Sequence, residues 1–328
     1  MNFLNSSKEN WVKMNSRKIK FGMCFSFDFL RENPLEDIGE KLQVYLRFLD
    51  FCSKKDWEVY VLTRKTYKGN GIFTGSWKYE DQKFKKVIDP VRIDIVYDRT
   101  GGLKFPLEND DLLVVNTRDF KTLCWDKWLQ YKEVGKYMAK SYLLKKNEKE
   151  SLPDILSQIK GEFVVLKPTN GLKGIGIYIG AKKGVQKFEF RKNTNYLVQE
   201  FIDTSSGIVG VVEGMHDLRV VIVNAKAVWS HVRTPPKGSF EANVAQGGTI
   251  EEVDYEKSIP DSIKRMVKEI SKDFYKKYDN PVYSLDFGMS KAKPYLIEIN
   301  DTIGFPRWKM KKRDNFLTQL VENIESKL

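Results

Sequence analysis

The segment Phe163–Gly180, FVVLKPTNGLKGIGIYIG, restricts the possible folds more than any other part of the chain. An apolar strand leads to Lys167, a turn with Gly171, Gly174 and Gly176 follows, and a second apolar strand comes next. It is not a Walker A loop, because no Gly-Lys-Ser/Thr follows the glycines. It is not a dinucleotide-binding fingerprint either, because the glycines lead to a strand and not to a helix. Such a unit can fold over a phosphate chain, since glycines allow close approach and backbone N–H groups donate hydrogen bonds. The pattern predicts phosphate binding, and the alternative is an ordinary glycine-rich hairpin.

The first third of the chain alternates apolar strands with a helix. Apolar residues at helical spacing predict a helix over Glu40–Lys55, and the segment Thr66–Ser76, rich in Gly, Tyr and Lys, reads as a loop. Apolar runs predict strands at Phe21–Phe27, Trp57–Thr63, Ile93–Tyr97 and Leu112–Val115. This order predicts an α/β unit over residues 19–118, with ligands beyond the strand ends, and residues 1–18 read as a flexible tail.

Beyond residue 118, helices are expected first and strands afterwards. Residues 119–160 read as helical, with helices over Trp125–Ala139 and Leu152–Lys160 and a charged linker, Lys145–Glu150, between them. A later helix over Ile259–Lys277 and a final helix over Asn315–Leu328 are expected. Strands are predicted at Phe163–Leu166, Ile175–Ile179, Tyr196–Gln199, Leu218–Val223 and Ala227–His231, and a hairpin at Val282–Phe287 and Tyr295–Ile299.

Composition excludes several classes of protein. The 328 residues contain 41% hydrophobic residues, which is enough for packed cores. No apolar run reaches the roughly 18 residues of a membrane span, and the polar N-terminus is not a secretory signal. Three scattered cysteines form no metal or disulfide pattern, so a reducing cytoplasm is expected. Only His216 and His231 could serve a histidine-based mechanism. The net charge of +12 indicates either an anionic partner or a solvated lysine-rich surface.

The hairpin near the C-terminus carries three oxygen donors. Asp286 lies in its first strand, while Glu298 and Asn300 are two residues apart in the second and therefore share a face. Ile297 and Ile299 are expected on the other face, against a core. Carboxylate and amide oxygens suit Mg²⁺, which usually bridges to substrate phosphates. The pattern therefore predicts a magnesium site.

Two arginines come next to polar segments. Strand alternation places Asp217 and Arg219 on one face, and Arg233 ends the following strand. A loop over Lys237–Gly248, with Asn243, follows. The arginines suit bidentate capture of a carboxylate or phosphate, and the alternative is surface salt bridges. Upstream, the strand YLVQEFI can offer backbone groups and apolar walls to an adenine ring.

Taken in order, the motifs LKP…G..G.G, QEFI, DLR…R.P, N…GG and D…EIN resemble the ATP-grasp superfamily. The resemblance is greatest to bacterial-type glutathione synthetases and ribosomal-protein glutamate ligases, and it runs from about Asn116 to Gly304. It implies an α/β ATP-grasp fold with a Rossmann-like N-terminal domain (19–118), a central lobe with the glycine-rich loop (119–199) and a C-terminal lobe with the metal site (200–328).

The resemblance also implies a reaction and a set of site residues. The family couples ATP hydrolysis to the joining of a carboxylate and an amine through an acyl-phosphate, releasing ADP and phosphate. Two Mg²⁺ ions, for which Mn²⁺ can substitute, would be held by Asp286, Glu298 and Asn300. Arg219 and Arg233 would face the transferring phosphoryl group. ATP would contact Lys127, Lys167, Gly171, Gly174, Gly176, Asn243 (phosphates), Gln199, Glu200, Phe201 (adenine hinge) and Asp217 (ribose).

The chain departs from the family in three places. The turn Asp98–Gly102 stands where glutathione synthetases carry their own motif, and Asp301–Gly304 replaces the usual small residue and Pro-Gly. A product other than glutathione is therefore expected. The basic run Arg307–Arg313 reads either as a solvated turn or as a site for an acidic acceptor.

Several alternatives for the function remain open. The substrates are a small carboxylate and an amine, such as an amino acid or peptide, or the acceptor is an acidic protein or carrier tail. The other class is an ATP-binding protein without ligase activity. No aromatic-plus-basic motif indicates nucleic acid, no membrane contact is expected, and a homo-oligomer, dimer or tetramer, is compatible with the sequence.

Overall fold

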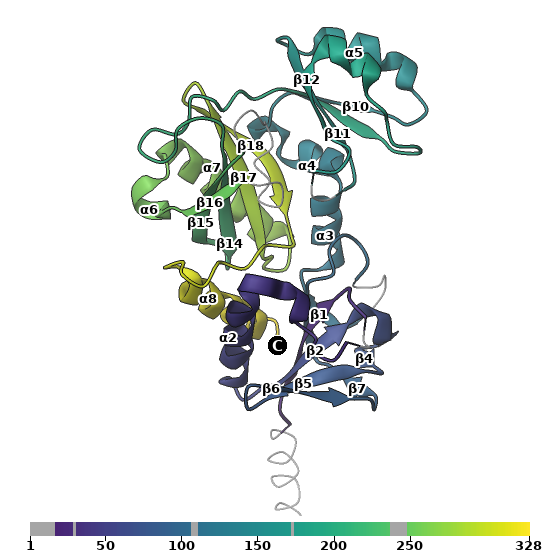
Figure 1. Ribbon diagram of the computed structural model, residues 1–328, viewed down its shortest axis with the longest axis vertical. Helices are drawn as coiled ribbons and strands as arrows, with labels where there is room; N and C mark the ends of the chain where they lie inside the picture. Colours follow the sequence, from purple (N-terminus) through teal and green to yellow (C-terminus); the bar gives the residue numbers. More distant parts are fainter. Residues whose placement is uncertain (1–16, 29–30, 106–110, 172–173, 237–247) are drawn as a thin grey trace, which may run out of the picture.

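The computed structural model describes residues 17–28, 31–105, 111–171, 174–236 and 248–328. It has three parts: an N-terminal α/β domain, a small middle lobe and a C-terminal lobe (Figure 1). This mixed α/β architecture is the predicted fold class. Most of the predicted flexible tail, residues 1–18, lies outside the described residues. In the described part of the chain, none of the helices has the length and apolar character needed to cross a bilayer.

The N-terminal domain is built on a six-stranded sheet in the order β6-β5-β2-β1-β8-β9. Its parallel centre, β2-β1-β8-β9, is apolar because both faces are covered. Helix α2 (Leu42–Ser53) follows the 3-10 helix η1 (Glu36–Lys41) and packs on one face. The strands are β1 (Lys20–Phe25), β2 (Glu58–Thr63), β5 (Ser76–Glu80), β6 (Lys83–Val87), β8 (Ile95–Asp98) and β9 (Leu113–Val115).

One prediction in this domain is wrong. The expected loop Thr66–Ser76 contains β3 (Tyr67–Gly69) and β4 (Ile72–Phe73), and Ser76 begins β5. With β7 (Val91–Arg92), β3 and β4 form a separate three-stranded sheet. These strands are too short to show an apolar periodicity.

The middle lobe is an antiparallel sheet in the order β10-β13-β11-β12. The expectation that residues 119–160 are helical apart from a charged linker is wrong, because Ser141–Leu144 forms the edge strand β10. The expected helix Trp125–Ala139 is also divided, since α3 (Arg118–Trp125) ends where the Asp126 side chain caps α4 (Lys127–Val134). The remaining elements are α5 (Leu152–Gln158), β11 (Phe163–Pro168), β12 (Tyr178–Ala181) and β13 (Tyr196–Glu200).

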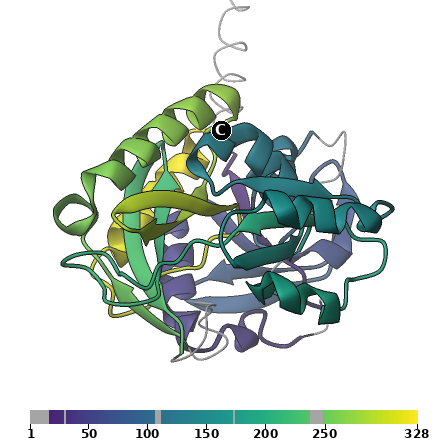
Figure 2. The same cartoon turned by 90° about the horizontal axis from the view of Figure 1, so that it is seen from above.

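The C-terminal lobe is a five-stranded antiparallel sheet in the order β16-β15-β14-β17-β18. Figure 2 shows helix α7 (Asp261–Lys277) lying along this sheet, on the side away from the middle lobe. The strands are β14 (Asp217–Val223), β15 (Lys226–Thr234), β16 (Thr249–Glu252), β17 (Tyr283–Ser290) and β18 (Lys293–Asn300), and the short helix α6 (Tyr255–Ser258) precedes α7. The C-terminal helix α8 (Arg313–Glu325) packs between this sheet and α2.

Alternation along β14 and β17 decides which side chains face α7. Leu218 and Leu285 belong to the core under α7, so Arg219 and Asp286 lie on the opposite face. On β18 the predicted alternation is wrong at one position. A bulge lets Asp286 pair with Glu298 and Phe287 with Leu296, so Ile297 is the extra residue and stays outside the core that buries Ile299.

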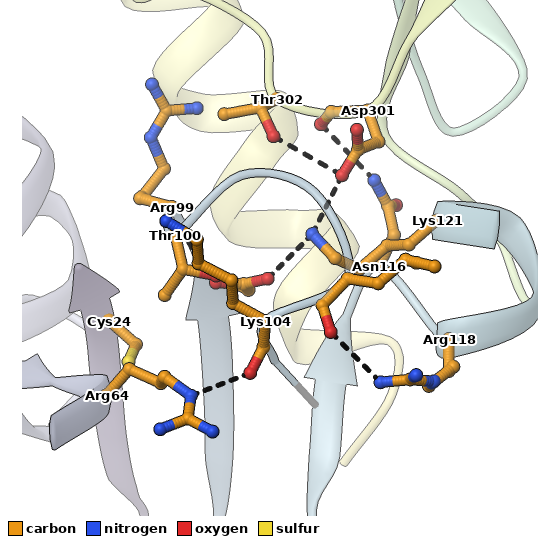
Figure 3. A network of polar contacts seen from close by, with 12 residues as sticks. Cys24, Arg64, Arg99, Thr100, Lys104, Asn116, Arg118, Lys121, Asp301 and Thr302 are labelled. Atoms are coloured by element: carbon orange, nitrogen blue, oxygen red, sulfur yellow. Dashed lines mark hydrogen bonds and ion pairs between the residues drawn. The ribbon is translucent and has the colours of Figure 1, made fainter. Parts of the chain in front are cut away.

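A buried lysine connects the N-terminal domain to the end of β18. Lys121, on α3, is 1% exposed, and its Nζ lies 2.7 Å from Asp98 Oδ2 and 2.8 Å from Asp301 Oδ2. Asn116 adds a second connection by donating to Val282 O at 2.6 Å and accepting from Val282 N at 2.6 Å. Figure 3 shows Lys121 between the two segments. Burial opposes the charge on Lys121, but the two carboxylates outweigh it and raise the lysine pKa.

We expect the Lys121→Met variant to lose about 3–5 kcal/mol of unfolding free energy, because it leaves two buried carboxylates without their cation. Urea unfolding followed by circular dichroism measures this loss. The control is Lys65→Met, which removes a lysine from an exposed pair with Asp28 and should cost less than about 1 kcal/mol. Equal unfolding midpoints for the two variants would contradict the structural role of Lys121.

Candidate functional site

The candidate site lies on the face of the C-terminal sheet opposite α7. Arg219 on β14 is the cross-strand neighbour of Asp286 on β17, and Asp286 is in turn the neighbour of Glu298 on β18. Directly opposed side chains in a sheet lie on one face. A cation and two carboxylates therefore form one row across three strands. Asp217 and Arg233 are opposed in the same way on β14 and β15.

Asp286 is the most strongly engaged of these groups. Arg219 donates to it through Nε and Nη2, both at 2.6 Å, in a bidentate pair. Arg233 Nη2 donates to Asp286 Oδ2 at 2.9 Å and also contacts Asp217. Asn300 Nδ2 donates to the same Oδ2 at 3.1 Å. The structure therefore brings four other predicted site residues together around one buried carboxylate.

The two aspartates of this cluster have opposite pKa shifts. Burial opposes ionisation of Asp286, but Arg219 and Arg233 outweigh it and lower the pKa of this carboxyl. Burial and the charge of Asp286 raise the pKa of Asp217, against the effect of Arg233. The Oδ1 atom of Asp217 is buried and accepts no hydrogen bond from the described residues. Asp217 thus lies in the ion-pair cluster, and its assignment as a ribose acceptor stays a prediction.

Lys127 connects the glycine-rich loop to the carboxylates. Its Nζ lies 3.0 Å from Glu298 Oε1 and donates to Gly171 O at 3.1 Å. Its backbone N–H donates to Thr169 O at 2.8 Å, so the start of α4 is attached to the end of β11. Because Asp126 caps α4 through two backbone N–H groups, the position of Lys127 is set by local structure.

Lys167 lies at the same end of the middle lobe and is 6% exposed. Burial is the main cause that lowers the pKa of Lys167 to about 8; Lys127 adds to this effect and Glu298 opposes it. A buried lysine with a reduced pKa favours an anionic ligand, since a phosphate would stabilise its charged form.

The loop after Lys167 has the backbone that its glycines predict. Gly174 and Gly176 have φ values of +73° and +81°, which disfavour other residues. A Cβ atom on Gly176 would lie 2.9 Å from Arg191 Nε. Residues 172–173 of the loop lie outside the description.

The predicted adenine hinge is at the end of β13. Gln199 is buried and donates through Nε2 to Ser141 Oγ at 2.8 Å. Glu200 accepts from Lys160 N at 3.2 Å, and the Phe201 ring lies 5.7 Å from the Phe163 ring. The side-chain amide of Gln199 on β13 thus connects to Ser141, the first residue of the edge strand β10. The hinge assignments stay predictions. Asn243 and most of the predicted loop Lys237–Gly248 lie outside the described residues.

The donor set fits a hard cation. Asp286 and Asn300 are in contact, Glu298 is the cross-strand neighbour of Asp286, and all three offer oxygen. Asp286 is held ionised by its arginines. No group of three or more His, Cys, Asp and Glu side chains suited to a metal occurs in the described part of the chain, so a cation here would need the amide oxygen of Asn300.

Sequence reasoning did not identify the supporting Lys121, nor Lys41, whose pKa is lowered by burial and by the charges of Arg99, Arg307 and Arg219. A single lysine on a helix reads as a solvated residue, so the sequence has no signal for Lys121 or Lys41. Arg99 lies within the turn Asp98–Gly102. The only feature of the sequence that could have indicated a functional role for it is the position of this turn directly after a strand.

The sequence model of the family described as RimK-like ATP-grasp domain matches residues 127–324 of this chain. Because this span is more than half of the chain, the chain belongs to the RimK-like ATP-grasp family, and the predicted resemblance is confirmed. ATP-grasp proteins use ATP, typically with Mg²⁺.

Curated relatives match over part of their length. A probable alpha-L-glutamate ligase of Shewanella sp. (strain MR-4) is 27% identical over 183 residues, which cover 55% of this chain and 56% of that protein. A probable alpha-L-glutamate ligase of Aeromonas salmonicida (strain A449) is 25% identical over 181 residues, covering 54% and 55%. The chain spans about half the length of these relatives.

Solved structures support the fold over nearly the whole chain. The D-alanine–D-alanine ligase from Bacillus anthracis complexed with ATP superimposes with a TM-score of 0.61 at 16% identity, covering 95% of this chain and 97% of that one. The RimK domain ATP-grasp protein from Sphaerobacter thermophilus gives 0.58 at 12% identity, covering 93% and 99%. The predicted ATP-grasp fold is therefore confirmed.

We expect binding of a non-hydrolysable ATP analogue with Mg²⁺ to take up about half a proton at pH 8, because phosphate would restore the charge of a lysine whose pKa is about 8. Calorimetry in buffers of different ionisation enthalpy measures the uptake. Lys167→Arg stays charged and should show none, and its affinity should not fall as the pH rises through 8. The same uptake in both proteins would exclude Lys167 as the titrating group.

Proposed function

We propose that the protein is an ATP-dependent carboxylate–amine ligase that forms a peptide-like amide bond and releases ADP and phosphate. The observation that carries the proposal is the clustering of Lys127, Arg219 and Arg233 against Asp286 and Glu298 in an ATP-grasp fold. Such a cluster has both the cations for a phosphate chain and the oxygen donors for Mg²⁺.

The pairing within the site suggests how nucleotide and metal would bind. In this structure Lys127 pairs with Glu298, and Arg219 and Arg233 pair with Asp286. Mg²⁺ on Asp286, Glu298 and Asn300 would neutralise the carboxylates, and the cations would then be available to phosphate oxygens. The metal would supply charge neutralisation of the phosphates and their orientation. We therefore propose that ATP and Mg²⁺ bind interdependently, with two Mg²⁺ ions, for which Mn²⁺ can substitute.

The chemistry follows from the poor reactivity of a carboxylate. A substrate carboxylate oxygen attacks the γ-phosphorus, the bond from that phosphorus to the β,γ-bridging oxygen breaks, and ADP leaves. The amine then attacks the acyl carbon, phosphate leaves with the former carboxylate oxygen, and the nitrogen loses a proton. Lys127, Lys167 and Arg233 would stabilise charge on the transferring group and keep the reactants aligned.

The remaining side chains do not favour an enzyme-bound acyl group. Cys24, Cys52 and Cys124 are buried, and burial raises the pKa of each thiol well above its usual value. His231 is also buried; burial, Arg219 and Arg233 lower its pKa far below the usual range. His216 holds the backbone, since its Nε2 accepts from Met289 N at 3.1 Å. These groups support a route in which the acyl-phosphate is the activated species.

We propose an amino acid or peptide as substrate, because the relatives are named as probable alpha-L-glutamate ligases. An acidic protein or carrier tail remains the alternative acceptor, and no observation favours an ATP-binding protein without ligase activity. Three unpaired, buried cysteines support the cytoplasm as the compartment.

The proposal predicts that Glu298→Gln and Asp286→Asn each reduce turnover by at least about 10²–10³-fold, because each removes a charge that orients the metal and phosphates. ADP release with pooled amino acids and peptides measures turnover, and circular dichroism checks the fold. Glu256→Gln removes the same charge at an exposed position of the short helix α6 and should retain wild-type activity. Near wild-type turnover of either site variant would refute the metal assignment.

Arg233→Ala should lower kcat by about 10²-fold or more while the ATP affinity changes less, since the arginine would act mainly on charge developed during transfer. Steady-state kinetics combined with analogue binding separates the two effects. Equal losses in both would make Arg233 an ordinary nucleotide-binding residue.

A further inference from the structure

The glycine-rich loop has a neighbour that the proposed reaction does not use. Arg191 lies in the segment between the 3-10 helix η5 (Lys182–Lys187) and β13. Its backbone N–H donates to the hydroxyl of Tyr196 at 3.1 Å, and Tyr196 is 1% exposed. The ring of Phe190 lies 4.9 Å from the Tyr196 ring. The backbone of Arg191 is therefore attached to the core of the middle lobe.

The side chain of Arg191 lies across both ends of the loop. A Cβ atom built on Gly176 would lie 2.9 Å from its Nε and 3.2 Å from its Cδ. A Cβ atom built on Gly171 would lie 4.0 Å from its Nη1. The guanidinium therefore packs on the loop backbone at Gly176, in the space that any other side chain would occupy, and extends toward Gly171.

The contact with the loop is what distinguishes this arginine from an ordinary surface cation. In the part of the chain that the structure describes, the Arg191 side chain makes no ion pair with a carboxylate and donates no hydrogen bond, and only its backbone N–H is engaged. A guanidinium can stabilise its surroundings through packing as well as through charge. Here the group on which it packs is the loop itself.

Arg191 and Lys167 approach the loop from different faces of the middle sheet. Leu166 and Tyr196 belong to the core under α5. Lys167 follows Leu166 on β11 and is the cross-strand neighbour of Leu197, so it faces away from that core. Arg191, whose backbone is bound to Tyr196, comes from the core side. It would therefore act through the loop and not on the phosphates directly.

A loop of this composition needs such support. Glycine residues lose more conformational freedom on ordering than other residues, and phosphate binding requires the backbone N–H groups in one arrangement. At the start of the loop, Gly171 O accepts from Lys127 Nζ. At its end, the guanidinium of Arg191 packs on Gly176. Contacts that fix a loop before the ligand arrives lower the entropic cost of binding.

We propose that Arg191 is a positioning residue for the nucleotide: its guanidinium holds the two ends of the glycine-rich loop in the arrangement in which the loop backbone binds the phosphates of ATP. This inference rests on the proposed function and adds to it a residue outside the predicted site. The planar group is required, because it packs on Gly176 while its far nitrogen extends to Gly171. A lysine has a single terminal nitrogen and cannot do both.

The experiment measures, by calorimetry with Mg²⁺, how tightly the full chain binds a non-hydrolysable ATP analogue and AMP. We expect Arg191→Ala to weaken analogue binding about 5-fold or more and to leave AMP binding within about two-fold, because AMP lacks the two outer phosphates. Arg191→Lys keeps the charge and should recover less than half of the loss. Lys192→Ala removes the charge of the next residue, which is exposed, and should bind both ligands like the wild-type protein.

A double-mutant cycle tests whether Arg191 acts through Gly176. Gly176→Ala places a methyl group against the guanidinium and strains a backbone with a φ of +81°. The strain is the same in both backgrounds, whereas the clash is absent from the Arg191→Ala protein. We expect the loss of analogue affinity caused by Gly176→Ala to be at least about 3-fold smaller in that background. Circular dichroism checks the fold of each variant, and if Gly176→Ala does not fold, the Arg191 variants decide alone.

Four outcomes would each overturn the inference: unchanged analogue affinity in Arg191→Ala, an equal loss for AMP, full recovery in Arg191→Lys, or an equal effect of Gly176→Ala in both backgrounds. The ligase proposal would then still stand, provided that the wild-type protein binds the analogue. A wild-type protein that binds no analogue would count against the ligase proposal itself, on which the inference rests.

Discussion

The pairing of Arg219 with Asp286 is the interaction on which the rest of the site depends. It places a carboxylate at 2% exposure between two arginines on neighbouring strands. Removing one partner of such a pair leaves a buried charge and costs about 3–5 kcal/mol. The sheet can hold it because Leu218 and Leu285, next to these residues, point to the opposite face and pack under α7. Core packing on one face thus orients charge on the other.

Charge compensation within the site has a functional consequence. Lys127 pairs with Glu298, and Arg233 pairs with both Asp217 and Asp286, so these two cations already have carboxylate partners. A bare metal ion or bare phosphate would each have to displace one of these partners and leave the other unpaired. A magnesium–nucleotide complex supplies both charges together.

Much of this organisation could be predicted from the chain alone. The glycine-rich hairpin, the strand positions of Arg219 and Asp286 and the donor triad all follow from strand alternation and residue type. The bulge at Ile297 could not be predicted, since one extra residue leaves an apolar strand looking regular. Strand β10 was missed because SYLL is short and lies next to charged residues. Lys121 and Lys41 could not be recognised, because their burial arises only where distant segments meet.

The most direct test of the proposed acyl-phosphate route follows the oxygen of the substrate carboxylate. The wild-type enzyme, a carboxylate substrate labelled with ¹⁸O, the amine and Mg²⁺–ATP are incubated, and the phosphate and nucleotide products are analysed by mass spectrometry. Transfer of the γ-phosphoryl group to the carboxylate predicts one labelled oxygen in inorganic phosphate, with unlabelled ADP as the nucleotide product. Label in AMP, or phosphate without label, would contradict it.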